Sequence, residues 1–160
     1  MIYLSVDPGN VTGVAHWNSN NPDVRPSTLE IPGGLYGLVD WWITEGQDWW
    51  QGVGQFFVED FIIRPNTHKL TRQPAAYEAL GWVKGWCHGN GHPCGVIGPS
   101  EHTPYSSYKV KRDSKIVRLG WSTWTPDLHE DAACSVLLMG LKRTNLGALA
   151  PLLERIATHV

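Results

Sequence analysis

The sequence predicts a single α/β domain, residues 1–160, with a mixed five-stranded sheet flanked by helices. Two alternating apolar runs near the N-terminus are separated by a tight turn. Further along, short apolar runs alternate with longer segments of helical periodicity, and no linker or repeat divides the 160 residues. A chain of this length suits one domain with one sizeable core.

The expected strands follow from these runs. Residues 2–7 and 11–17 flank the turn Pro8-Gly9-Asn10 and predict a β-hairpin. After the polar, proline-rich loop NSNNPDVRPS, the segment TLEI, residues 28–31, is the expected third strand. QFFVEDF, residues 55–61, is an apolar run that ends in acid, as a strand buried on both faces does. CGVIGP, residues 94–99, is the expected fifth strand.

The expected helices account for most of the remaining chain. Apolar residues recur at helical spacing in residues 34–50. Residues 74–87 begin with proline, which is favoured at the first helical position. From residue 100 onward the chain is expected to be mostly helical, with segments near 112–119, 126–142 and 146–158.

The composition indicates an ordinary globular protein. The hydrophobic content is 42% and the formal net charge is −2, which argues against a coating-type nucleic-acid binder. No apolar stretch approaches the roughly 20 residues that span a bilayer, and no secretory signal is visible. Three cysteines form no disulfide framework, so we expect a cytoplasmic protein, in the host cytoplasm if a phage encodes it.

Acidic residues end two of the expected strands. Asp7 follows the first apolar run, and Glu59 and Asp60 end the fourth. Asp7 has a structural alternative, because an aspartate at this position also caps a turn. If the two strands are parallel neighbours, however, the acids converge at the carboxyl edge of the sheet, where α/β proteins place their sites.

A third acidic group opens the late helix in TPDLHEDAACSVLLMGL. Thr125 and Pro126 suit the helix start, so Asp127, Glu130 and Asp131 fall in its first turns. The helix dipole explains Asp127 well, whereas Asp131 leads into the apolar face. Carboxylates from three separate elements are what hard divalent cations require, and two such ions support phosphodiester cleavage.

Three motifs occur in a recognisable order: VDPGNVTGVA from residue 6, VEDF from residue 58 and HEDAA from residue 129. Together they resemble RuvC-type Holliday junction resolvases, particularly the short phage members. The resemblance implies an RNase H-like fold, a homodimer, and Mg²⁺- or Mn²⁺-dependent nicking of branched DNA such as four-way junctions, flaps and forks. It assigns catalytic and metal-binding roles to Asp7, Glu59 and Asp131.

The fourth ligand does not follow the bacterial pattern, in which two carboxylates stand three residues apart on the late helix. The residue three before Asp131 is Leu128, and the residue three after it is Cys134. Glu130 is the favoured fourth ligand, and Asp127 is the alternative, because capping already explains Asp127. The catalytic lysine of bacterial members has no counterpart shortly after the fifth expected strand.

Basic residues cluster in two places that suit DNA contact. Phosphate contacts position a bound strand, and a solvated helix face is the alternative meaning of such a run. The first group follows Glu59 and the second lies in YKVKRDSKIVR; their members are Arg64, Lys69, Arg72, Lys109, Lys111, Arg112, Lys115 and Arg118.

Other interpretations remain open. Cys87, His88, His92 and Cys94 are potential zinc ligands whose spacing fits no common finger. The nine tryptophans suit base stacking, but a core or dimer seam is the favoured interpretation. The protein is alternatively a non-catalytic RNase H-like binding module. The Asp-x-Gly turn also resembles the phosphate-binding turn of the actin and hexokinase superfamily, which needs a second domain.

Overall fold

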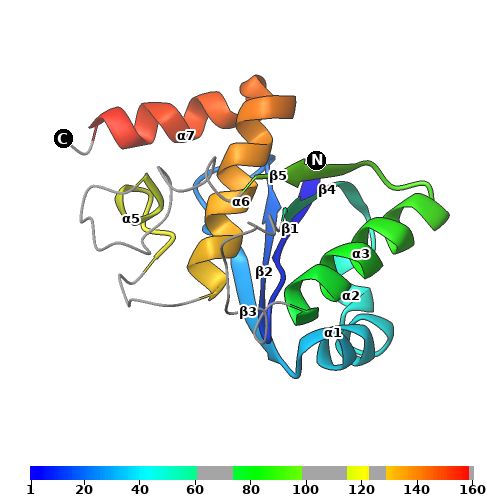
Figure 1. The fold of residues 1–160 in the computed structure, drawn as a ribbon. Helices are drawn as coiled ribbons and strands as arrows, with labels where there is room; N and C mark the ends of the chain where they lie inside the picture. Colours follow the sequence, from blue (N-terminus) through cyan, green and yellow to red (C-terminus); the bar gives the residue numbers. More distant parts are fainter. Residues whose placement is uncertain (61–73, 99–114, 123–128, 159–160) are drawn as a thin grey trace.

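A computed structural model describes residues 1–60, 74–98, 115–122 and 129–158 (Figure 1). Its five-stranded sheet has the order β3-β2-β1-β4-β5, with β1 and β2 antiparallel, β2 and β3 antiparallel, and β1, β4 and β5 parallel. The mixed sheet and the N-terminal hairpin are therefore confirmed. The strands are β1 (Ile2–Asp7), β2 (Val11–Asn18), β3 (Ser27–Pro32), β4 (Val53–Glu59) and β5 (Cys94–Ile97).

Helices cover both faces of the sheet. One face carries α1 (Gly34–Ile43), α2 (Gln47–Trp50) and α3 (Pro74–Gly89). The other carries α6 (His129–Thr144), with α5 (Lys115–Arg118) and α7 (Leu146–Thr158) packed outside it. Figure 1 shows α6 running along the sheet while the α1–α3 group lies on the opposite side.

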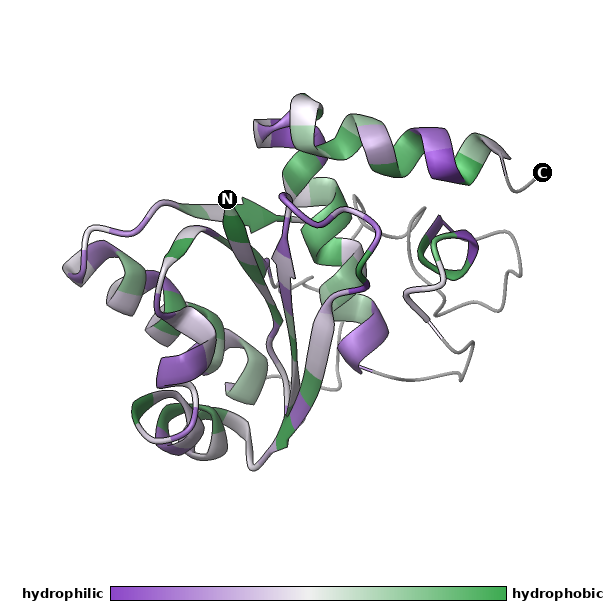
Figure 2. Cartoon of the chain, turned by 180° about the vertical axis from the view of Figure 1, so that it is seen from behind, coloured by the Kyte–Doolittle hydropathy of each residue, from purple (hydrophilic) through white to green (hydrophobic). Residues whose placement is uncertain are grey.

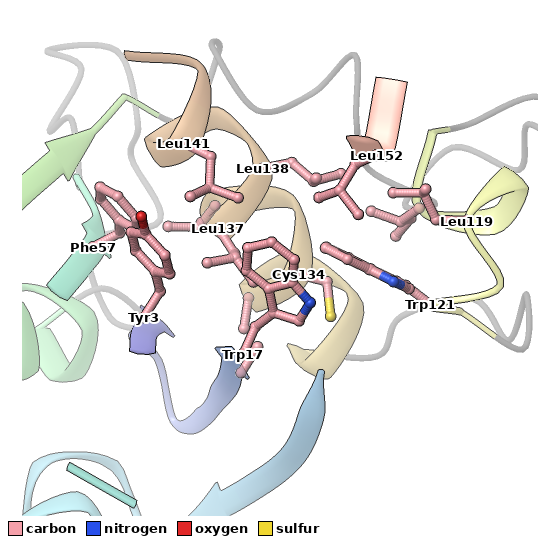
Figure 3. Close-up of a cluster of buried hydrophobic side chains, with 14 of the residues drawn as sticks. Tyr3, Trp17, Phe57, Leu119, Trp121, Cys134, Leu137, Leu138, Leu141 and Leu152 are labelled. Carbon is pink, nitrogen blue, oxygen red and sulfur yellow. The ribbon is translucent and has the colours of Figure 1, made fainter. Parts of the chain in front are cut away.

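The period of two along each strand divides the core into two clusters. On β1, Leu4 and Val6 face α1 and α3, where they join a cluster that includes the fully buried Trp42. Tyr3 faces α6 and stacks on Phe57 at 6.1 Å between ring centroids. Figure 3 shows this second cluster, in which leucines of α6 lie between Tyr3 and Phe57 on one side and Leu152 on the other.

Hydropathy changes along α6. Most of the helix is hydrophobic, as a helix enclosed between a sheet and outer helices must be, whereas its first turn is hydrophilic (Figure 2). That first turn reaches the carboxyl edge of the sheet, where β1 and β4 end. The polar turn is therefore placed at the edge at which the sequence predicts a site.

The helix expected over 34–50 is interrupted. The structure divides it into α1 and α2, because Thr44 and Gly46 end the first helix. The Thr44 hydroxyl donates to the Asp40 carbonyl at 2.7 Å, and the Gly46 amide donates to the Trp41 carbonyl at 2.7 Å. These bonds close the last turn of α1. The apolar spacing continues past this point, so the spacing alone does not predict the break between α1 and α2.

Other boundaries differ by a few residues. The fourth strand begins at Val53 and ends at Glu59, and the late helix extends to Thr144. Residues 112–114 and 126–128 of the expected helices lie outside the described residues. Trp42 is fully buried and Trp41 nearly so, and Trp49 and Trp50 pack against the same core, which supports the core interpretation. No helix within the described ranges is long and apolar enough to cross a membrane.

Candidate active site

Asp7 and Glu59 end two parallel, hydrogen-bonded strands. The β1–β4 register pairs Val6 with Val58, so the next residue on each strand is one of the two acids. Because Phe57 faces α6, Glu59 does so as well, and Asp7 shares that face with Tyr3. The pKa of Asp7 is raised mainly by burial and further by the neighbouring Glu59 carboxyl. The predicted convergence of these two acids is confirmed.

Asp7 is an unusual aspartate. Its residue surface is only 8% exposed, and burial is the main reason that its pKa is raised to about 7. The hydrogen bond with His129 lowers the pKa, whereas Glu59 raises it. A buried carboxylate and a neighbouring one repel each other when both are ionised, and a cation between them removes that repulsion.

The turn after Asp7 does not depend on its side chain. The Gly9 amide donates to the Thr12 hydroxyl at 3.4 Å, while the Asp7 carboxylate interacts with Glu59 and His129. A turn-capping role therefore does not explain why this strand ends in an aspartate.

His129 is the site residue that the sequence analysis missed. Its Nδ1 lies 2.9 Å from Asp7 Oδ2, and this hydrogen bond is the main reason that the pKa of His129 is raised. An Nδ1–H that donates to Asp7 leaves Nε2 as the other ring nitrogen available to a ligand. The available signal was position, since His129 directly precedes the two acids of HEDAA.

The first residues of α6 contact three different parts of the protein. His129 contacts β1, whereas Glu130 Oε2 accepts a hydrogen bond from the Thr28 hydroxyl of β3 at 2.7 Å. Asp131 is only 5% exposed and accepts a hydrogen bond from the Ser122 hydroxyl. Of these three residues, His129 is hydrogen-bonded to Asp7 and Asp131 to Ser122, while the favoured fourth ligand, Glu130, is hydrogen-bonded to β3.

A glycine allows α6 to approach the sheet this closely. Gly13 is the β2 partner of Asp7, and a Cβ built on it would lie 2.0 Å from the His129 carbonyl oxygen. Farther along α6, a Cβ on Gly140 would lie 2.4 Å from the Phe57 ring. Between them, the Ser5 hydroxyl donates to the Ala133 carbonyl at 2.7 Å. These three contacts fix the height of α6 above the acids.

Several predicted site residues lie outside the described residues: Asp127, Arg64, Lys69, Arg72, Lys109, Lys111 and Arg112. Lys115 and Arg118 are half-buried on α5, beside α6. Within residues 1–60, 74–98, 115–122 and 129–158, no three or more His, Cys, Asp or Glu side chains are grouped to hold a metal ion. Cys87, His88, His92 and Cys94 lie within these ranges, so they are not grouped to hold a zinc ion.

The donor set nevertheless suits a hard divalent cation in part. Asp7 and Glu59 offer carboxylate oxygens at the ends of adjacent strands, and His129 adds a ring nitrogen beside Asp7. The buried Asp7 carboxyl, whose pKa is raised by burial and by a neighbouring acid, is a group that a cation would stabilise in its ionised form.

The sheet order, the parallel β1–β4 pair and the packing of α6 across one face of the sheet define an RNase H-like fold. Among solved structures, Thermus thermophilus RuvC in complex with a Holliday junction substrate has a TM-score of 0.65 at 15% identity. That match covers 92% of this chain and 97% of the other. A second T. thermophilus RuvC structure gives 0.58 at 16% identity, covering 92% and 98%. No protein-family model and no curated protein sequence matches the chain.

Proposed function

We propose that this protein is a divalent-metal-dependent endonuclease that nicks branched DNA, resolving Holliday junctions as a homodimer. The observation that carries the proposal is the buried Asp7 beside the half-buried Glu59 at the carboxyl edge of the sheet, with His129 bonded to Asp7. The likeness to a RuvC structure that contains a Holliday junction substrate supports the choice of DNA substrate.

The metal-holding residues would be Asp7 and Glu59, with His129 and Asp131 contributed by α6. Bound Mg²⁺ or Mn²⁺ supplies activation of a water and stabilisation of the leaving oxygen in phosphodiester hydrolysis. Asp7 orients the His129 ring through the hydrogen bond at Nδ1. The other candidates for the fourth ligand are Glu130, which accepts a hydrogen bond from the Thr28 hydroxyl, and Asp127.

The first prediction concerns metal and substrate. A labelled four-way junction should be nicked with Mg²⁺ or Mn²⁺, whereas Ca²⁺ should support binding without cutting, because its looser coordination does not hold an in-line geometry. Linear duplex of the same sequence is the control substrate, and three-way and flap DNA test the range of branches. Gel electrophoresis of labelled strands measures the nicks.

Two results would contradict this proposal. Cutting that persists in excess chelator refutes the metal site. Tight junction binding with no nicking in any divalent metal would instead favour the second candidate, a non-catalytic RNase H-like module, which the fold alone also allows.

The second prediction concerns the basic residues, which we propose contact DNA phosphates. Replacing Lys109, Lys111 and Arg112 together by Gln should weaken junction binding and reduce its dependence on salt, because fewer counterions are released. The measurement is junction affinity at several salt concentrations. A matched control neutralises Lys142 and Arg143 in the last turn of α6, far from the acids. Unchanged affinity and salt dependence would identify the run as a solvated face.

A further inference from the structure

We propose that Glu30 and Thr28, on the edge strand β3, are positioning residues that hold the first turn of α6 so that His129 meets Asp7. The inference rests on the proposed function for its effect on nicking. The contacts that carry it are independent of any metal.

Glu30 binds the backbone of the site residue itself. Its Oε1 accepts a hydrogen bond from the His129 amide at 2.8 Å. The amides at the start of a helix lack partners within the helix, so a carboxylate from another element can accept a hydrogen bond from one of them. Its negative charge also interacts favourably with the positive end of the helix dipole. Here the acceptor is supplied by a strand 99 residues away in sequence.

The strand register explains how one residue is held from two sides. Gly13 on β2 pairs with Asp7 on one side and with Glu30 on the other, so the three residues form a row across the sheet. His129 lies over this row. Its ring binds Asp7, its amide binds Glu30, and its carbonyl rests above Gly13, where no Cβ intervenes. The position of His129 is thus fixed through both its ring and its backbone.

Thr28 provides a second attachment from the same strand. It lies two residues before Glu30 and therefore on the same face, and its hydroxyl donates to Glu130 Oε2 at 2.7 Å. This contact assigns Glu130 a role in anchoring α6 to β3. Two successive residues of α6 are thereby tied to two alternate residues of one strand.

The experiment compares Glu30→Ala, Glu30→Gln and Thr28→Val in the full chain, with Glu154→Ala as a control at an exposed carboxylate on α7. The first readout is hydrogen exchange of the His129 amide in metal-free protein. Glu30→Ala should accelerate this exchange about tenfold or more, because the amide loses its charged acceptor. Glu30→Gln should restore most of the protection, since the side-chain amide oxygen also accepts.

The second readout is nicking of a four-way junction with Mn²⁺. Glu30→Ala should lower kcat about tenfold with little change in KM, because a misplaced His129 affects the reacting geometry rather than DNA binding. Thr28→Val should show a smaller loss of the same kind. Glu30→Gln should recover kcat, and Glu154→Ala should match the wild type.

The outcomes separate this inference from the proposed function. Wild-type exchange and kcat in Glu30→Ala, or equal losses in Glu30→Gln and Glu30→Ala, would overturn the positioning role. A wild-type protein that never nicks DNA would refute the proposed function, and the exchange of the His129 amide would still decide whether Glu30 holds it.

Discussion

Asp7→Asn should abolish nicking, with a fall in rate of a hundredfold or more, on the order expected when a metal ligand is lost. Asparagine has nearly the same shape and keeps an acceptor for His129 Nδ1, which lies 2.9 Å from Asp7 Oδ2. It lacks the charge that holds a cation. Junction binding in Ca²⁺ should survive, because one repulsive carboxylate near the phosphates is removed.

The same substitution should stabilise the metal-free protein in a pH-dependent way. Burial raises the pKa of Asp7 from 3.8 to about 7, so folded protein keeps a proton that unfolded protein releases. Wild-type stability is therefore lost as the pH rises from about 4 to about 7. His129 acts in the same direction, because its pKa is raised and its contribution is lost above that raised value.

Thermal unfolding at a series of pH values measures this effect. The advantage of Asp7→Asn over wild type should be largest near pH 8 and smallest near pH 5, because asparagine does not titrate. Wild-type cutting rates in Asp7→Asn, or a variant that fails to fold, would instead identify Asp7 as a structural residue.

Gly13→Ala should have the largest effect on the architecture of the site. The added Cβ would lie 2.0 Å from the His129 carbonyl oxygen, which belongs to the backbone and has no flexible side chain to move aside. The first turn of α6 must shift, at a cost of about 3 kcal/mol in the free energy of unfolding. Displacement of His129 from Asp7 should lower nicking about tenfold or more.

A control exists at another glycine. Gly81 lies on the exposed side of α3, where a Cβ meets nothing within 4 Å, so Gly81→Ala should stabilise the protein by about 0.5–1 kcal/mol. Chemical denaturation of both variants, together with nicking rates, gives the comparison. If Gly13→Ala were as stable and active as wild type, α6 would not depend on close contact with the sheet.

The sequence predicted those parts of the site that depend on single elements. Asp7 and Glu59 end strands whose alternation and apolar runs are visible, and the parallel pairing brings them together. His129 was not predicted, because its role depends on where α6 meets the sheet. That meeting depends on Gly13 and Glu30, which are distant in sequence from α6.

The same reasoning applies to Glu130 and to the α1–α2 break. Residue type alone made Glu130 a ligand candidate, whereas its contact with Thr28 depends on the register of β3 against β2. The break at Thr44 and Gly46 arises from hydrogen bonds of the Thr44 hydroxyl and the Gly46 amide to carbonyl groups of α1, which apolar spacing does not encode. Local sequence pattern thus predicted the helices and strands, whereas contacts that the pattern does not encode determined the role of Glu130 and the end of α1.

The attachment of α6 to the row Asp7–Gly13–Glu30 has a consequence during synthesis of the protein. The three strands that form the row emerge from the ribosome long before His129 does. A nascent chain or a truncated fragment therefore presents the strand acids without the histidine that contacts Asp7. On the proposed function, a chain that ends before α6 lacks His129 and Asp131 and is therefore expected not to nick DNA.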